Sequence, residues 1–171
     1  MKKKLLLILI LLTFFANAQK DSQSKVLFVY DNENERNERI ITGIKEELNK
    51  NEIEITQRDL KESKKGKNDI TTFSYILIYS EVRAFKMRIF LRRWLRKIDS
   101  FNGKKVGIFV SAITWKYSKK ITEKIKATIT EKEGQFLDID AITMATNNMT
   151  EHDKKKRAKR FAKSFVNSLK N

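Results

Sequence analysis

The stretch KVLFVYDNENERNERIITGIKEEL, residues 25–48, predicts a buried strand, a polar turn and a helix in succession. Its apolar run at residues 26–29 is typical of a parallel strand covered on both faces. Beyond the turn, apolar residues recur at the spacing of one helix face, at Ile40, Ile41, Ile44 and Leu48. Unpaired backbone N–H groups at a helix start favour an anion. The turn also carries the carboxylates of Asp31, Glu33 and Glu35, whose charge opposes such a ligand.

The rest of the chain continues this alternation of strands and helices. Strands are expected at residues 53–56, 73–79, 106–112 and 136–144, and helices at residues 86–98, around residues 121–129 and after Thr150. Alternating strands and helices imply right-handed parallel crossovers, with helices on both faces of the sheet. We therefore expect a three-layer α/β fold, with a five-stranded parallel sheet in the order 2-1-3-4-5. No internal repeat divides the chain, so residues 19–171 are expected to form one domain.

The first 18 residues have the pattern of a cleavable signal peptide. Lys2, Lys3 and Lys4 precede an apolar run at residues 5–15, which ends in the small-residue site at residues 16–18. A membrane anchor is the alternative, but this run is short when a spanning helix needs about 20 residues. We expect cleavage before Gln19 and a periplasmic or extracellular location.

Composition narrows the chemistry of the mature domain. The chain has no cysteine, which excludes disulfides and thiolate metal sites. Its formal charge of +16 falls to 16 − 3 = +13 once the three lysines of the signal peptide are removed. His152 is the only histidine, and it lies in the charged start of the last helix, where a solvated role is expected. No catalytic residue and no metal site is therefore predicted.

In a sheet of this order, ligands bind beyond the carboxyl ends of strands 1, 3 and 4. Those ends correspond to three loops at residues 31–37, 80–86 and 112–118.

The first of these loops resembles the phosphate-binding turn of the flavodoxin-like family. From Tyr30 to Leu48 the turn and helix match that family in length without a gap. The resemblance implies FMN as cofactor, with its phosphate held by the turn residues Asn32, Asn34, Glu35, Arg36 and Asn37. Asparagine amides replace the family's hydroxyls, and Glu35 replaces its glycine. The alternative is that these asparagines only cap the first helix.

The second loop, SEVRAFKMRIFLRRWLRKI at residues 80–98, resembles the menaquinone-dependent protoporphyrinogen-oxidase branch of that family. The match rests on Val82-Arg83 and on the helix residues Leu91, Arg93 and Trp94, whereas Ala84-Phe85 departs from it. The resemblance implies a flavin ring between two groups of side chains, with a quinone or another redox partner. One side is assigned to Ser80, Arg83 and Phe85, and the other to Ser111 and Trp115. For Tyr117 we favour the alternative to stacking on the ring, in which one of Trp115 and Tyr117 packs inward and the other lies on the surface.

Two helices carry basic residues at every fourth position. The first has Arg88, Arg92 and Arg96, and the last has Lys155, Lys159 and Lys163. Such faces are either simply solvated or attached to anionic lipid. Nucleic acid is not expected as a partner, because exposed aromatic residues do not alternate with these cations. The sequence does not predict the oligomeric state.

Two functions remain in view. The first is an exported FMN-binding electron-transfer protein or oxidoreductase, with a quinone as one candidate partner. The second is a flavodoxin-like module without flavin, whose basic helices bind an anionic partner or membrane surface.

Overall fold

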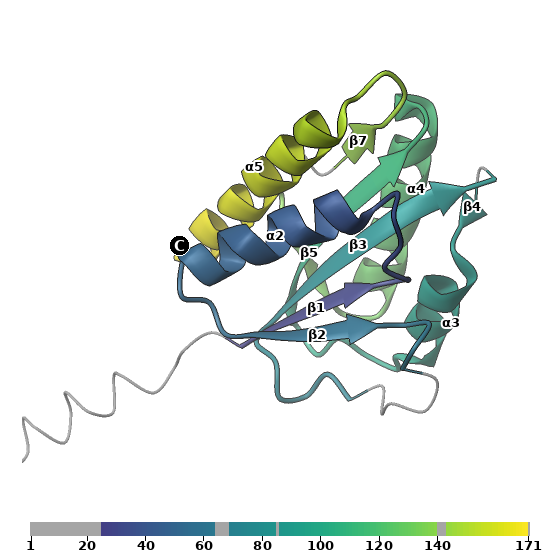
Figure 1. The fold of residues 1–171 in the computed structure, drawn as a ribbon. Helices are drawn as coiled ribbons and strands as arrows, with labels where there is room; N and C mark the ends of the chain where they lie inside the picture. Colours follow the sequence, from purple (N-terminus) through teal and green to yellow (C-terminus); the bar gives the residue numbers. More distant parts are fainter. Residues whose placement is uncertain (1–24, 64–68, 85, 140–142, 171) are drawn as a thin grey trace, which may run out of the picture.

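The computed structural model describes residues 25–63, 69–84, 86–139 and 143–170. The signal peptide expected at residues 1–18 and the candidate ring contact Phe85 lie outside these ranges. A twisted sheet forms the middle of three layers (Figure 1). Helices α2 (Glu38–Lys50) and α5 (Glu151–Leu169) cover one face of the sheet, and α3 (Ile89–Lys97) and α4 (Trp115–Glu131) cover the other.

The central strands are parallel, in the order β2-β1-β3-β5-β6. They are β1 (Val26–Tyr30), β2 (Ile55–Asp59), β3 (Tyr75–Arg83), β5 (Lys105–Ala112) and β6 (Gln135–Phe136). Every residue of β1 is buried, as its apolar run predicts for a strand between two helical layers. The predicted fold class and strand order are thus confirmed.

The fifth position of the sheet is made of two short strands, so the continuous strand expected at residues 136–144 is wrong. Lys105 pairs with Gln135, a separation of 135 − 105 = 30 residues. Val110 pairs with Thr143 of β7 (Thr143–Ala145), a separation of 143 − 110 = 33 residues. Because the two separations differ by three residues, β6 and β7 do not share one register against β5.

The end of the third strand also differs from expectation. β3 runs on to Arg83, turns at Ala84 with φ +45°, and pairs antiparallel with β4 (Lys86–Met87). Because this hairpin takes up residues that were expected to be helical, α3 starts at Ile89 instead of residue 86. Trp115 and Tyr117, expected in a loop, lie in the first turn of α4.

Two apolar cores lie on the two faces of the sheet. The core under α3 and α4 includes Leu91, Trp94, Ile121 and Ile125, and the core under α2 and α5 includes Ile41, Ile44, Phe161 and Phe165. The helix periodicities predicted these positions. Within the described ranges, no helix combines the length and the apolar character that crossing a membrane requires.

Candidate functional site

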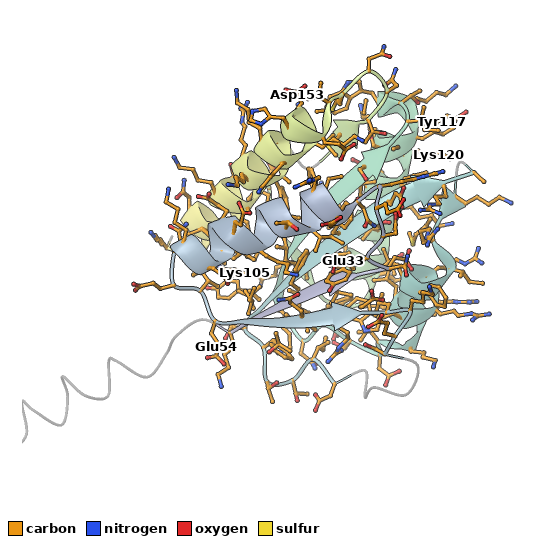
Figure 2. All side chains as sticks on the ribbon, viewed as in Figure 1. Glu33, Glu54, Lys105, Tyr117, Lys120 and Asp153 are labelled. Carbon is orange, nitrogen blue, oxygen red and sulfur yellow. The ribbon has the colours of Figure 1, made fainter. Side chains whose placement is uncertain are left out.

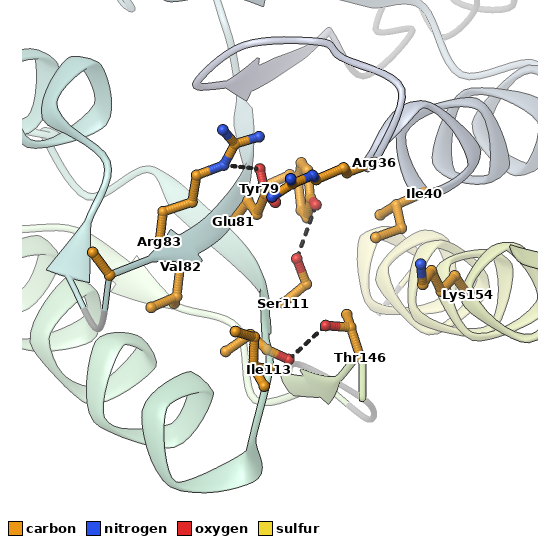
Figure 3. A pocket seen from close by; sticks show the side chains of 12 residues that line it. Arg36, Ile40, Tyr79, Glu81, Val82, Arg83, Ser111, Ile113, Thr146 and Lys154 are labelled. Atoms are coloured by element: carbon orange, nitrogen blue, oxygen red, sulfur yellow. Dashed lines mark hydrogen bonds and ion pairs between the residues drawn. The ribbon is translucent and has the colours of Figure 1, made fainter. Parts of the chain in front are cut away.

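A cavity of about 450 Å³ opens at the carboxyl ends of β3 and β5, where the strand order predicts a ligand (Figure 3). Basic and acidic side chains lie on its walls beside an apolar set that includes Ile40, Val82 and Ile113. Three of the ten residues that the sequence assigns to the cofactor site line this cavity, namely Arg36, Arg83 and Ser111. It brings together the start of α2, the β3–β4 hairpin, the end of β5 and the start of α5.

The inner wall of the cavity holds a buried pair of hydroxyls. The Tyr79 hydroxyl and the Ser111 hydroxyl lie 2.9 Å apart, and both side chains are buried. Burial raises the pKa of Tyr79 above its usual range, which keeps the phenol neutral. Ser80 follows Tyr79 on β3, so its side chain points to the opposite face of the sheet. There the Ser80 hydroxyl is buried and has no hydrogen-bond partner among the described residues.

The loop at residues 31–37 is closed by its own asparagines. Asn37 accepts a hydrogen bond from the backbone N–H of Asn34 at 2.8 Å and donates through its amide to the carbonyl of Asn32 at 2.7 Å. The Asn34 amide also donates to that carbonyl, and its oxygen accepts from the backbone N–H of Arg36. Asn37 is the residue before α2, but its side chain makes no capping bond to that helix. One turn earlier, however, Asn34 and Asn37 make the reciprocal bonds of a cap, because the Asn34 side-chain oxygen accepts from Arg36 N–H and the Asn37 side-chain oxygen accepts from Asn34 N–H. The asparagines therefore hold the loop and also cap the turn that leads into α2, as the capping alternative expects.

The remaining backbone bonds draw the same loop inward. The backbone N–H of Glu33 donates to the Asp59 carboxylate at 3.0 Å, and those of Asn37 and Glu38 donate to the carbonyl of Asn34. A bound phosphate needs several free donors converging on it. Here these donors already have protein acceptors, and the exposed Glu33 and Glu35 add negative charge. The donor set does not fit an FMN phosphate in this loop conformation.

Arg83 joins this loop to the β3–β4 hairpin. Its Nε lies 3.1 Å from the Glu81 carboxylate, and its terminal nitrogen donates to the Asn34 side-chain oxygen at 3.3 Å. Figure 3 shows Arg83 directed toward Glu81 beside the cavity. The loops expected to hold the phosphate and the ring are thus tied to each other by one guanidinium.

Trp115 stands apart from the cavity, although the sequence assigns it to a flavin ring. Its side chain is 50% exposed, and the Arg157 guanidinium lies over its ring at 4.8 Å. Ile113 lines the cavity instead. Tyr117 packs against the core under α3 and α4, as expected.

Asp31 has a structural role that the sequence does not reveal. Its side chain is 3% exposed and accepts a hydrogen bond from the backbone N–H of Leu91 in the first turn of α3 at 3.1 Å. Arg88 Nε lies 3.8 Å from its second oxygen. Burial raises the pKa of Asp31 to about 6, against the lowering effect of these two partners. In the sequence, the only indication of this role is that Asp31 directly follows a buried strand.

No group of three or more acidic, histidine or cysteine side chains in the described part of the chain is placed to hold a metal ion. His152 is exposed in the first turn of α5.

No family model and no curated protein matches this chain. Solved structures do match it, among them the rubredoxin:oxygen oxidoreductase of Desulfovibrio gigas, with TM-score 0.67 and 16% identity over 86% of this chain. Flavodoxin 2 from Bacillus cereus has TM-score 0.63 and 16% identity over 84% of this chain, and a flavodoxin from the Archaea has TM-score 0.62 and 15% identity over 86%. The chain spans 36% of the oxidoreductase and 99% of each of these two flavodoxins.

The protein therefore has a flavodoxin-like fold. At these identities the likeness establishes the fold alone. The resemblance to the protoporphyrinogen-oxidase branch stays a prediction.

Proposed function

We propose that this protein is a flavodoxin-like binding module that works without FMN and engages anionic partners through its basic helices. The observation that carries this proposal is the closed loop at residues 31–37. The backbone N–H groups of residues 33, 34 and 36–38 and the side-chain amides of Asn34 and Asn37 are bonded to acceptors of the protein. A phosphate would have to break those bonds before these groups could bind it.

Charge supports the binding half of the proposal. The surface that we call the α3–α4 face consists of the exposed residues Ile89, Arg92, Arg93, Arg96 and Lys97 of α3 and Trp115, Lys116, Lys119, Lys120 and Lys124 of α4. α3 contains four cations and no carboxylate. An outer surface of this kind attracts anions over a distance set by the salt concentration.

A titration with FMN tests the proposal. We expect a colourless purified protein that leaves the fluorescence of micromolar FMN unchanged, because the phosphate donors are occupied. Two variants test whether FMN is excluded by the negative charge of the loop or by the occupied hydrogen-bond donors. Glu33→Gln with Glu35→Gln removes the repulsion but keeps the backbone and asparagine hydrogen bonds of the loop, and Glu35→Gly restores the permissive residue. Neither is expected to gain binding. A yellow protein, or tight quenching of FMN by the wild type, would overturn the proposal.

FMN-dependent electron transfer is the second candidate, and the cavity favours it. The cavity lies where flavodoxin-like folds take their ligand, and its volume of about 450 Å³ suits a ring system. FMN, when bound, would supply the redox chemistry, and Arg83 and Ser111, which line the cavity, would contact it. If the titration shows binding, reduction of a quinone by the loaded protein becomes the next measurement.

Export belongs to both candidates. We propose that the protein acts outside the cytoplasm after cleavage before Gln19. Sequencing the amino terminus of the protein recovered from the cell envelope or the medium tests this. An intact Met1 on the recovered protein would contradict it.

A further inference from the structure

We propose that the α3–α4 face docks on an anionic lipid bilayer, with Ile89 and Trp115 entering the headgroup region. This inference rests on the proposed function, because it names the anionic partner that the basic helices bind.

The cations of the α3–α4 face differ from those of the opposite face in their partners. α3 and α4 contain 4 + 5 = 9 lysines and arginines against two glutamates, whereas α2 and α5 contain 3 + 7 = 10 against 3 + 2 = 5 acidic residues. On that opposite face, Glu46 binds Lys155 at 2.6 Å and Lys159 at 2.7 Å. Within the described ranges no ion pair involves a lysine or arginine of α3 or α4. In the sequence α3 and α5 are similar basic helices, but of these two only α5 has lysines that form ion pairs with acidic residues in the described part of the chain.

The exposed cations of α3 are regularly spaced. Arg92, Arg93, Arg96 and Lys97 follow Ile89 at i+3, i+4, i+7 and i+8, which is one stripe of a helix. On α4, Lys116, Lys119, Lys120 and Lys124 form a similar stripe. Figure 2 shows nitrogen-tipped side chains projecting outward around α3 and α4, including Lys120. Glu123 is the exposed carboxylate among the lysines of α4.

Exposed apolar side chains lie at one end of this face. The large exposed hydrophobic residues of the described chain are Ile89 (41%), Ile113 (62%) and Trp115 (50%). Because the central strands are parallel, α3 and α4 both start at the carboxyl edge of the sheet, so Ile89 and Trp115 share that end. Arg157 stacks on the Trp115 ring and holds it in place, while half of the side chain stays in water.

This combination fits a bilayer better than a soluble acidic protein. Tryptophan beside lysine and arginine is the side-chain mixture that proteins place at the membrane interface. Anionic lipid attracts the cations, and the headgroup region accepts the apolar tips. An acidic protein surface would pair the cations but leave Ile89 and Trp115 solvated.

Sedimentation with lipid vesicles tests the proposal on the purified chain. Partitioning onto vesicles with about one third phosphatidylserine is compared with partitioning onto vesicles of pure phosphatidylcholine. The uncharged vesicles measure the binding that the apolar residues 5–15 contribute, which is the same in every variant. Arg92→Gln, Arg93→Gln and Arg96→Gln together should weaken partitioning onto the anionic vesicles roughly a hundredfold. The matched control Arg39→Gln, Lys50→Gln and Lys163→Gln removes the same charge from exposed positions on α2 and α5, and should weaken it less than about tenfold. Equal losses in the two triple variants would overturn the proposal.

Tryptophan fluorescence gives a second readout. Trp94 is 4% exposed and serves as a constant background, so a blue shift on adding anionic vesicles reports Trp115. We expect the shift in the wild type and its loss in Trp115→Phe. Poly-glutamate is the comparison ligand, and it should bind more weakly than the vesicles and cause no shift. Tighter binding to poly-glutamate, with no shift on vesicles, would assign the face to an acidic protein and reject the bilayer.

The two proposals fail separately. Flavin binding by a protein that still partitions onto anionic vesicles would reject the flavin-free function alone. A flavin-free protein that ignores the vesicles would reject the bilayer alone.

Discussion

Asp31 is a buried carboxylate that joins the end of β1 to the first turn of α3. It accepts a hydrogen bond from the backbone N–H of Leu91, a residue 60 positions away in the sequence. A carboxylate at a helix start is favoured by the helix dipole. Burial opposes this, because the charged form loses water, and the net effect raises the pKa of Asp31 to about 6 from 3.8. Asp31 therefore fixes the position of α3 while its charge lowers the stability of the fold.

The pH dependence of Asp31→Asn follows from that shift. Between pH 3.8 and about 6 the folded protein keeps a proton that the unfolded chain releases, so the free energy of unfolding falls as pH rises through this window. The asparagine oxygen can still accept from Leu91 but carries no charge. The difference in the free energy of unfolding between the variant and the wild type should therefore shift in favour of the variant by up to about 3 kcal/mol from pH 3.5 to pH 7, as measured by urea unfolding.

Asp153→Asn is the matched control, with the opposite sign. Hydrogen bonds from the hydroxyl and the backbone N–H of Thr150 hold the pKa of the exposed Asp153 below its usual value. Its contribution to stability is present above pH 3.8 and is lost as pH falls through the lowered pKa. This variant should therefore lose stability relative to the wild type as pH rises. If Asp31→Asn raised the free energy of unfolding by the same amount at every pH, the destabilising effect assigned to the buried charge of Asp31 would be contradicted.

At the scale of elements, α2 and α5 pack closely against each other at Gly43. A Cβ added at Gly43 would lie 2.9 Å from the carbonyl oxygen of Lys155 and 3.3 Å from Ala158 Cβ. The first contact is with helix backbone, which cannot move aside as a side chain can. Gly43 therefore sets the distance between the two helices, and it brings Lys155 and Lys159 within reach of Glu46.

Gly43→Ala should destabilise the protein even though alanine favours a helix. The propensity gain of about 1 kcal/mol opposes an overpacking cost of about 1 to 3 kcal/mol. We expect a net loss of about 1 kcal/mol in chemical unfolding. Asn49→Ala, at an exposed position of the same helix, provides the comparison and should be neutral or slightly stabilising. A Gly43→Ala protein more stable than the wild type would show that the helices separate without cost.

At the scale of the whole molecule, positive charge is in large excess over its partners. The chain has 37 lysines and arginines against 21 acidic residues, and six ion pairs join residues in the described ranges. Mutual repulsion of this kind destabilises a compact state. The α3–α4 face concentrates the cations that have no such pair.

The melting temperature should therefore rise when salt increases from about 10 mM to 150 mM, as the screening length falls from about 30 Å to about 8 Å. The triple variant Arg92→Gln, Arg93→Gln and Arg96→Gln should show a smaller rise, because it has less repulsion to screen. Calorimetry or circular dichroism measures both. A melting temperature that falls with salt would indicate that the ion pairs outweigh the repulsion.

The sequence by itself determined the four helices, the parallel strands and the faces that they bury, and the strand order followed from the fold class that this alternation indicates. The elements follow from local periodicity: the run at residues 26–29 has the composition of a covered strand, and Thr150 caps α5 where the last apolar period begins. Periodicity records which residues are buried, and burial is what aligns elements in layers.

Only the tertiary structure decided the state of the candidate site. The β3–β4 hairpin, the Asp31 contact with α3 and the link from Arg83 to Asn34 join residues whose proximity depends on the path of the chain. The same holds for Glu46, which binds Lys155, a residue 109 positions later in the sequence. This contact is why the basic helix α5 has an acidic partner, whereas the basic helix α3 has none among the ion pairs of the described residues. Local patterns carry no information about such long-range partners, because hydrogen bonds and ion pairs depend on distances that the fold alone sets.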